Sequence, residues 1–249
     1  ANYLKSTNGM LADDYSIAIQ RLQISVIPDE LPCRENERKF IDNYIREVVT
    51  SHRTKPPLYI CGMPGTGKTA TVLSCLNNLR KEVDKGLVPE FDFIEINCLR
   101  LKSPADAYTQ LWRGLTGYHV SAKTAQNKLS SFFASNQIRI KTTGTDNREH
   151  ILVCLMDELD FLLTRDFRVI YNLFDWSMHE RSGFLLIGIS NTMDLPERIS
   201  ARVESRTIIN IQRQIFQPYN YSQVNEIIEK RLINLHLKYF DKKAIEFIS

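Results

Sequence analysis

The feature that most constrains the fold of this chain is the glycine-rich octapeptide Gly-Met-Pro-Gly-Thr-Gly-Lys-Thr at residues 62–69. It fits the pattern G-x-x-x-x-G-K-[ST], in which a loop turns its backbone N–H groups toward phosphate oxygens at the start of a helix. An apolar run at residues 58–61 predicts a buried parallel strand before the loop, and Lys68 opens the predicted helix after it. This context disfavours the alternative of an incidental glycine turn.

The loop supplies both a cation and a metal ligand for a bound nucleotide. Lys68 is predicted to contact the β- and γ-phosphates of ATP, and the Thr69 hydroxyl is a candidate Mg²⁺ ligand. The residues predicted to bind the nucleotide here are Gly62, Pro64, Gly65, Thr66, Gly67, Lys68, Thr69 and Ala70.

A second apolar run, residues 151–156, ends on two acids. Asp157 is placed to hold Mg²⁺ through its water shell, and Glu158 can orient and deprotonate the attacking water. The alternative is a pair of exposed loop acids, which strand ends in α/β sheets often carry. Asp160 fits a cap or ion-pair partner better than a third catalytic acid. Asn191 ends the next apolar strand, where it can sense the γ-phosphate as a catalytic residue or serve only in a turn.

Strands that alternate with helices predict a parallel sheet of five strands flanked by helices. The strands are predicted at residues 58–61, 91–97, 151–156, 184–190 and 206–212, and helices at 34–52, from 68, and at 104–114, 121–134, 166–180 and 221–237. The predicted division is a flexible segment 1–14, an ATP-binding α/β domain 15–213 and the beginning of a helical lid, 214–249.

Charge and cysteine usage narrow the class of protein. Thirty-two basic and 29 acidic residues leave a net charge of only +3, which leaves DNA binding open without indicating it. Five cysteines are odd in number and widely spaced, which predicts reduced core thiols in a cytosolic or nuclear protein. The sequence has no apolar run of bilayer length and no apolar signal segment, so we expect a soluble, non-secreted protein.

Several segments together resemble the AAA+ initiators, and in particular the family of the largest subunit of the eukaryotic origin recognition complex. The P-loop identifies only the superfamily, while the narrower signals are Tyr-Asn-Leu-Phe-Asp-Trp at 171–176 and Asn-Thr-Met-Asp-Leu-Pro-Glu-Arg at 191–198. Leu-Pro-Cys-Arg-Glu at 31–35, Asp-Glu-Leu-Asp at 157–160 and Phe-Gln-Pro-Tyr-Asn-Tyr-Ser-Gln at 216–223 extend the similarity from about residue 17 to the end.

This resemblance implies a nuclear ATPase that binds ATP and Mg²⁺ and helps load the replicative helicase at origins. Its implied partners are other origin recognition complex subunits, a helicase-loading cofactor and double-stranded DNA. By the family pattern, the segment around Pro32 and Arg34 would border adenine, with Tyr219 and Ile227 on its other side. Arg202 or Arg206 would reach a neighbour's γ-phosphate, or form mere surface charge. The basic residues Arg100, Lys102, Arg113 and Lys123 would face DNA phosphates, or a solvated helix face.

The sequence departs from the family pattern in two ways, and two alternative functions remain. The sequence ends at Ser249 before the family's Gly-Asp-x-Arg segment, and the winged-helix and long N-terminal regions are absent, so we expect a fragment of a longer protein. The alternatives are the related helicase-loading cofactor of the same clade and a nucleotide-gated scaffold with little hydrolysis. Intact Lys68, Asp157 and Glu158 disfavour the scaffold.

Overall fold

A computed structural model describes residues 16–17, 19, 32–51, 53–134, 151–163, 167–179, 182–195, 197–198 and 210–232. The strands form one five-stranded parallel sheet in the order β2-β3-β4-β1-β5, which confirms the predicted fold class. The strands are β1 Leu58–Gly62, β2 Phe91–Asn97, β3 Ile151–Asp157, β4 Phe184–Ser190 and β5 Gln212–Phe216. The helices are α2 Glu35–Ser51, α3 Lys68–Val83, α4 Asp106–Thr116, α5 Ala122–Ala134, α6 Arg168–Met178 and α8 Tyr221–Arg231, with 3₁₀ turns η1 Cys98–Arg100 and η2 Leu159–Leu162.

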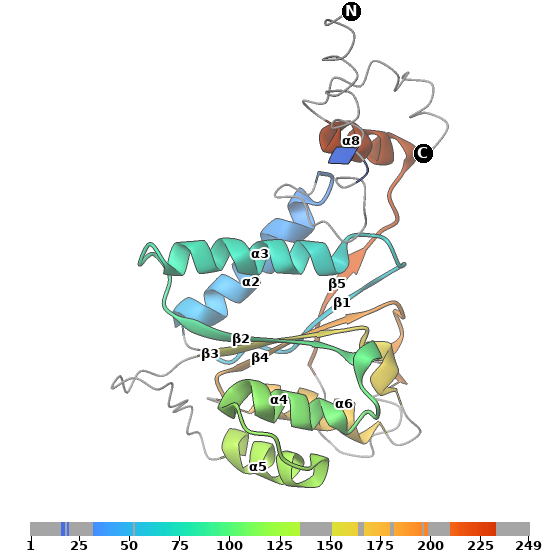
Figure 1. The fold of residues 1–249 in the computed structure, drawn as a ribbon. Helices are drawn as coiled ribbons and strands as arrows, with labels where there is room; N and C mark the ends of the chain where they lie inside the picture. The colour runs from blue at the N-terminus through green and yellow to red at the C-terminus, as the bar shows by residue number, and fades with distance from the viewer. Residues whose placement is uncertain are drawn as a thin grey trace, which may run out of the picture.

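Helices cover both faces of the sheet, with α2 and α3 on one face and α4, α5 and α6 on the other (Figure 1). Alternate residues of each central strand enter opposite cores: Leu58 and Ile60 pack with α2 and α3, whereas Tyr59 and Cys61 pack with α4 to α6. Such two-sided burial explains the unbroken apolar runs of β1, β3 and β4, because neither face of these strands meets water. Because all the paired strands run parallel, their carboxyl ends meet at one edge of the sheet.

The fifth strand is the main correction to the sequence reading. The prediction of a strand at residues 206–212 is wrong in its bounds, since β5 is Gln212–Phe216; residues 201–209 lie outside the described part of the chain. Isoleucine-rich sequence favoured the earlier stretch, but pairing with β1 sets the register: Leu58 aligns with Gln212 and Gly62 with Phe216. An edge strand also tolerates polar residues. The strand runs past the predicted domain boundary at residue 213, and the division into domains stays a prediction.

Helix α4 begins and ends two residues later than the sequence predicted, because two nearby glycines have different roles. Residues 104–114 were predicted, whereas α4 spans Asp106–Thr116 and ends at Gly117, whose φ of 77° makes it the left-handed C-cap. Gly114 lies inside the helix for a packing reason, because a Cβ there would meet the Ile94 side chain at 2.7 Å. The helix at 121–134 is confirmed as α5. The predicted flexible segment 1–14 and the residues 136–150 lie outside the described residues.

Four of the five cysteines are buried and all five are free thiols, while Cys33 is only half-buried. Burial raises the pKa of Cys75 and of Cys98 to about 12, so these thiols stay protonated at neutral pH. Among the described residues, no helix has the length and apolar character needed to cross a membrane.

Candidate active site

A cavity of about 490 Å³ lies where the loop after β1 meets the ends of β3 and β4 and one side of α8. Its wall is formed by Pro32, Pro64, Gly65, Thr66, Gly67, Lys68, Thr69, Ala70, Asp157, Glu158, Ile189, Ser190, Asn191, Tyr219, Val224, Ile227 and Arg231. The carboxyl edge of a parallel sheet is the usual place for a ligand site in α/β proteins, and the volume suits a small molecule.

The loop's glycines are required by its backbone. Gly65 and Gly67 have φ of 79° and 84°, which favour glycine. Gly67 also approaches Tyr219, because a Cβ there would lie 2.8 Å from the Tyr219 hydroxyl. At Gly62, which precedes the loop, a Cβ would lie 2.3 Å from the carbonyl oxygen of Phe216. The sequence pattern thus reflects close packing between β1, β5 and the loop.

Lys68 is only 7% exposed and its ammonium is held by three acceptors. Its Nζ donates to the carbonyl oxygens of Gly62 at 2.8 Å and Met63 at 2.9 Å, and to Asn191 Oδ1 at 3.0 Å. Burial lowers the pKa of Lys68 below its ordinary value, although the nearby carboxylates of Glu158 and Asp157 oppose the shift. The result is a cation fixed at the mouth of the glycine loop.

Thr69 and Asp157 come together from different elements. The Thr69 hydroxyl at the start of α3 lies 3.2 Å and 3.1 Å from the two carboxylate oxygens at the end of β3. Mg²⁺ prefers oxygen ligands, keeps several waters and usually takes one or two protein groups plus phosphate oxygens. This pair of oxygen donors beside a loop that can cradle phosphates therefore fits Mg²⁺ bound with a nucleotide.

Asn191 joins the cation to the proposed base. Its Nδ2 donates to Glu158 Oε2 at 2.9 Å, while its Oδ1 accepts from Lys68. Glu158 has a left-handed backbone with φ of 54°, which is uncommon for a residue other than glycine and costs on the order of 1 kcal/mol or more. The side chains predicted at the ends of two adjacent strands are thus linked in one chain of hydrogen bonds.

Asp160 holds Asn191 and its two neighbours in place through hydrogen bonds. Its carboxylate accepts from the Ser190 hydroxyl at 2.7 Å, the Asn191 backbone N–H at 2.8 Å and the Thr192 hydroxyl at 2.8 Å. Burial alone would raise the pKa of Asp160, but these hydrogen bonds outweigh it and hold the pKa below its ordinary value. Asp160 therefore acts as a hydrogen-bond acceptor that holds the segment carrying Asn191.

The far end of the cavity is built from sequence-distant segments. Pro32, Tyr219 and Ile227 line it, and the role that the family resemblance implied for them beside adenine stays a prediction. Sequence reasoning missed Val224 and Arg231 on α8, although their spacing around Ile227 puts all three on one helix face. That helical spacing could have identified both. Arg231 also supplies a cation on this wall.

The remaining predicted residues are placed differently. Arg34 is absent from the cavity wall and lies beneath the loop, and Gly62 contributes its carbonyl to Lys68 instead. The candidates Arg202 and Arg206 lie outside the described residues. The four DNA candidates are all exposed: Arg100 and Lys102 follow β2, Arg113 lies on α4 and Lys123 on α5. Their role stays a prediction.

Comparison with known proteins agrees with this geometry. Residues 58–213 match the family described as ATPase family associated with various cellular activities (AAA). The chain is 42% identical over 229 residues to origin of replication complex subunit 1A of Arabidopsis thaliana, and 40% identical over 230 residues to human origin recognition complex subunit 1. Each match covers 92% of this chain but only 27% and 25% of the relatives, so the chain spans about a quarter of their length.

A similar solved structure is that of Drosophila ORC bound to DNA. It superposes with a TM-score of 0.78 at 34% sequence identity, over 94% of this chain and 54% of that chain. The resemblance stated from the sequence is therefore confirmed, and it covers the ATPase region of these relatives.

Proposed function

This chain belongs to the AAA family of ATPases, and from that premise we propose that it binds and hydrolyses MgATP as the ATPase part of an origin recognition complex subunit. The observation that carries the proposal is the linked set of Lys68, Asn191 and Glu158, at 3.0 and 2.9 Å, beside the Thr69–Asp157 oxygen pair. A cation, an amide and a carboxylate gathered at a phosphate cradle are the groups that phosphoryl transfer to water requires.

Each group has a role in binding. The N–H groups of the loop and Lys68 would hold the β- and γ-phosphates, and Thr69 with Asp157 would hold Mg²⁺. Bound Mg²⁺ would neutralise charge on the phosphate oxygens. Pro32, Tyr219 and Ile227 would enclose the base. We propose that α8 begins a lid over this end of the cavity.

In the proposed hydrolysis, Glu158 accepts a proton from the attacking water. As a water oxygen attacks the γ-phosphorus of ATP, the bond from that phosphorus to the bridging oxygen breaks, and Glu158 accepts a water proton. The products are ADP and inorganic phosphate. Asn191 would keep Glu158 aligned until the γ-phosphate competes for its amide and for Lys68.

The relatives supply the wider context. One similar structure is that of Drosophila ORC bound to DNA, so we propose that this chain works with other origin recognition complex subunits on double-stranded DNA, in the nucleus. Helicase loading and contact with a helicase-loading cofactor complete the proposal. About 40% identity to subunit 1 proteins favours this reading over the cofactor itself. Assembly would bring a cation from a neighbour to the γ-phosphate, while Arg202 or Arg206 of this chain would serve the next subunit.

The test is single-turnover hydrolysis of labelled ATP by this chain, by a form extended through the complete lid, and by the extended form with partner subunits and DNA. A trans-acting arginine is typically worth about 10³ to 10⁵ in turnover, so assembly should give the largest rate increase. Equal rates in all three samples would contradict an interfacial site. Tight MgATP binding without turnover in any sample would instead indicate a nucleotide-gated scaffold.

A further inference from the structure

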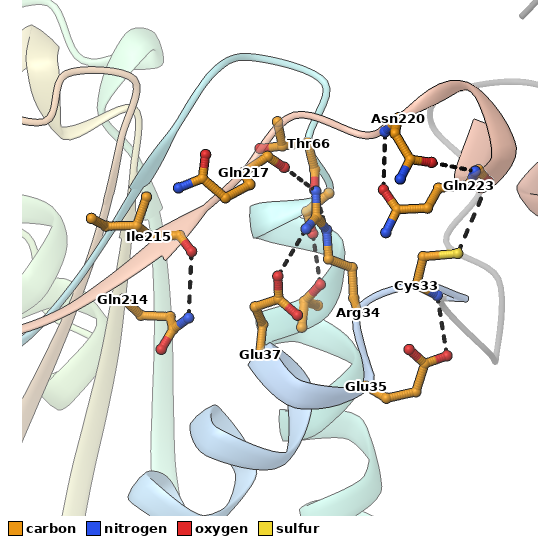
Figure 2. A network of polar contacts seen from close by, with 12 residues as sticks. Cys33, Arg34, Glu35, Glu37, Thr66, Gln214, Ile215, Gln217, Asn220 and Gln223 are labelled. Carbon is orange, nitrogen blue, oxygen red and sulfur yellow. Dashed lines mark hydrogen bonds and ion pairs between the residues drawn. The ribbon is translucent and has the colours of Figure 1, made fainter.

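Arg34 contacts the glycine loop and the segment before α8, and the adjacent Cys33 contacts α8 itself, although neither residue lines the nucleotide cavity. Figure 2 shows the Arg34 side chain between the loop and the segment that leads from β5 to α8. Arg34 is 3% exposed, which is rare for an arginine unless its donors are used.

Arg34 divides its donors among three elements. Its Nε donates to the Thr66 carbonyl oxygen at 3.1 Å, and Nη2 donates to the Gln217 carbonyl oxygen at 2.5 Å. Nη1 donates to Glu37 Oε1 at 2.8 Å, which neutralises the buried charge. Only a planar guanidinium offers donors in such a fixed fork, so lysine cannot reproduce the set.

Tyr219 extends the connection back to the loop. The Arg34 guanidinium carbon lies 4.0 Å from the centre of the Tyr219 ring, within cation–π range. The Tyr219 hydroxyl in turn packs against Gly67, where a Cβ would lie 2.8 Å away. The segment before α8 is therefore linked to the loop through Arg34, which donates to Gln217 and to Thr66 and lies over the Tyr219 ring.

Cys33 makes a second, separate contact with α8. Its thiol donates to Glu226 Oε2 at 3.3 Å, and its backbone N–H donates to Glu35 Oε1 at 3.1 Å. Cys33 has φ of 63°, a conformation that disfavours residues other than glycine. Strained backbone of this kind persists where surrounding contacts determine it, and often near functional sites.

We propose that Arg34 is a positioning residue which couples the placement of α8 to the conformation of the glycine loop, so that closure of α8 over the base and seating of the phosphates occur together. The proposal rests on MgATP binding at the site described above. Hinged closure depends on a few residues where elements join, and Gln217 and Tyr219 lie at the junction of β5 with α8. Because both Thr66 and Gln217 accept through backbone carbonyls, one side chain ties two main-chain segments together.

The test is a double-mutant cycle between Arg34 and Ile227, measured as MgATP affinity by calorimetry on this chain. Ile227→Ala alone should weaken binding about 5- to 30-fold, because Ile227 lies on the cavity wall. In an Arg34→Gln background the same substitution should cost less than about twofold, since α8 is no longer held over the loop. Arg34→Lys should behave like Arg34→Gln, because charge without the fork does not restore the contacts.

The matched control is Arg46→Gln, which removes a different arginine fork, on α2. Arg46 binds Glu82 at 3.0 Å and Asp42 at 3.2 Å, away from the cavity. In that background Ile227→Ala should retain its full 5- to 30-fold effect, so general destabilisation alone would not imitate the result.

The outcomes separate the two proposals. If wild-type chain fails to bind MgATP, the proposed function and the coupling are both wrong. If it binds and Ile227→Ala costs the same in the Arg34→Gln and wild-type backgrounds, only the coupling is wrong. Should both Arg34 variants fail to fold, Tyr219→Leu replaces them, and a retained full effect of Ile227→Ala in that background overturns the coupling.

Discussion

The two ends of the cavity are built in different ways. The phosphate end consists of short motifs that each begin where a strand stops: residues 62–69 after β1, Asp157 and Glu158 at β3, and Asn191 after β4. The far end joins Pro32, near the start of the described chain, to Tyr219 and α8 near its end. The phosphate end is thus encoded in short motifs that are each local in sequence, whereas the far end has no such motif and is recognised only once distant segments pack.

This difference suggests that the two ends of the cavity have different functions. The phosphate end has fixed charges and buried hydrogen bonds, so we expect it to provide chemistry and most of the phosphate affinity. The far end offers apolar surface and a helix attached through one linking segment, so we expect it to add base contacts and conformational control. The following experiments test this difference in function.

The largest effect is expected from Glu158→Gln. Turnover should fall by about 10² to 10⁴, because the amide keeps the shape and its hydrogen bond to Asn191 but cannot accept a proton. MgATP affinity should stay within about twofold. Single-turnover hydrolysis in the assembled complex measures the rate, with the exposed Glu95→Gln on β2 as the control. Normal turnover would remove Glu158 from the role of base.

Lys68→Ala should weaken binding of the phosphates, whether or not the ligand carries a base. Loss of the buried cation should weaken MgATP and magnesium pyrophosphate alike, by roughly 10- to 150-fold, as expected for charge-assisted hydrogen bonds worth about 1.5 to 3 kcal/mol. Calorimetry with each ligand checks this, and the exposed Lys39→Ala on α2 is the control. Near-normal affinity would contradict the assignment of the phosphate end.

Ile227→Ala should separate the two ends. Its expected 5- to 30-fold loss should appear with MgATP but not with magnesium pyrophosphate, which has no base to contact the far end. An equal loss with both ligands would mean that the far end acts on the phosphates as well, and the comparison would fail. Ile228→Ala, the next residue on α8, gives a control outside the cavity wall.

The smallest effect concerns Asp160, which holds the Asn191 segment. Asp160→Asn should lower the free energy of unfolding by about 1 to 2 kcal/mol at pH 7, because an amide cannot accept from all three donors. The pKa of Asp160 is lowered in the folded state, so its stabilisation is complete above the unfolded-state value, near 3.8, and is lost as pH falls through the folded value. Urea unfolding of both proteins at several pH values should show the difference shrinking below pH 4. A constant difference would contradict this role.

The sequence by itself determined the sheet's central strands and the phosphate end. Runs such as residues 151–156 and 184–190 leave no solvent-facing positions, so burial on both faces was the only consistent reading, and the polar residue after each strand had to reach the same edge. The glycines, Lys68 and Thr69 lie close together in sequence, and the glycines themselves indicate where the loop needs a positive φ.

Only the tertiary structure decided the register of β5, the choice between Gly114 and Gly117, and the position of Arg34. Each depends on a contact between residues far apart in sequence: Gly62 with Phe216, Gly114 with Ile94, and Arg34 with Thr66 and Gln217. Local propensity is similar for the competing alternatives, so the free energy of packing and of satisfying a buried guanidinium selects among them. The sequence could place Arg34 near the nucleotide, but only the packed fold put it beneath the loop.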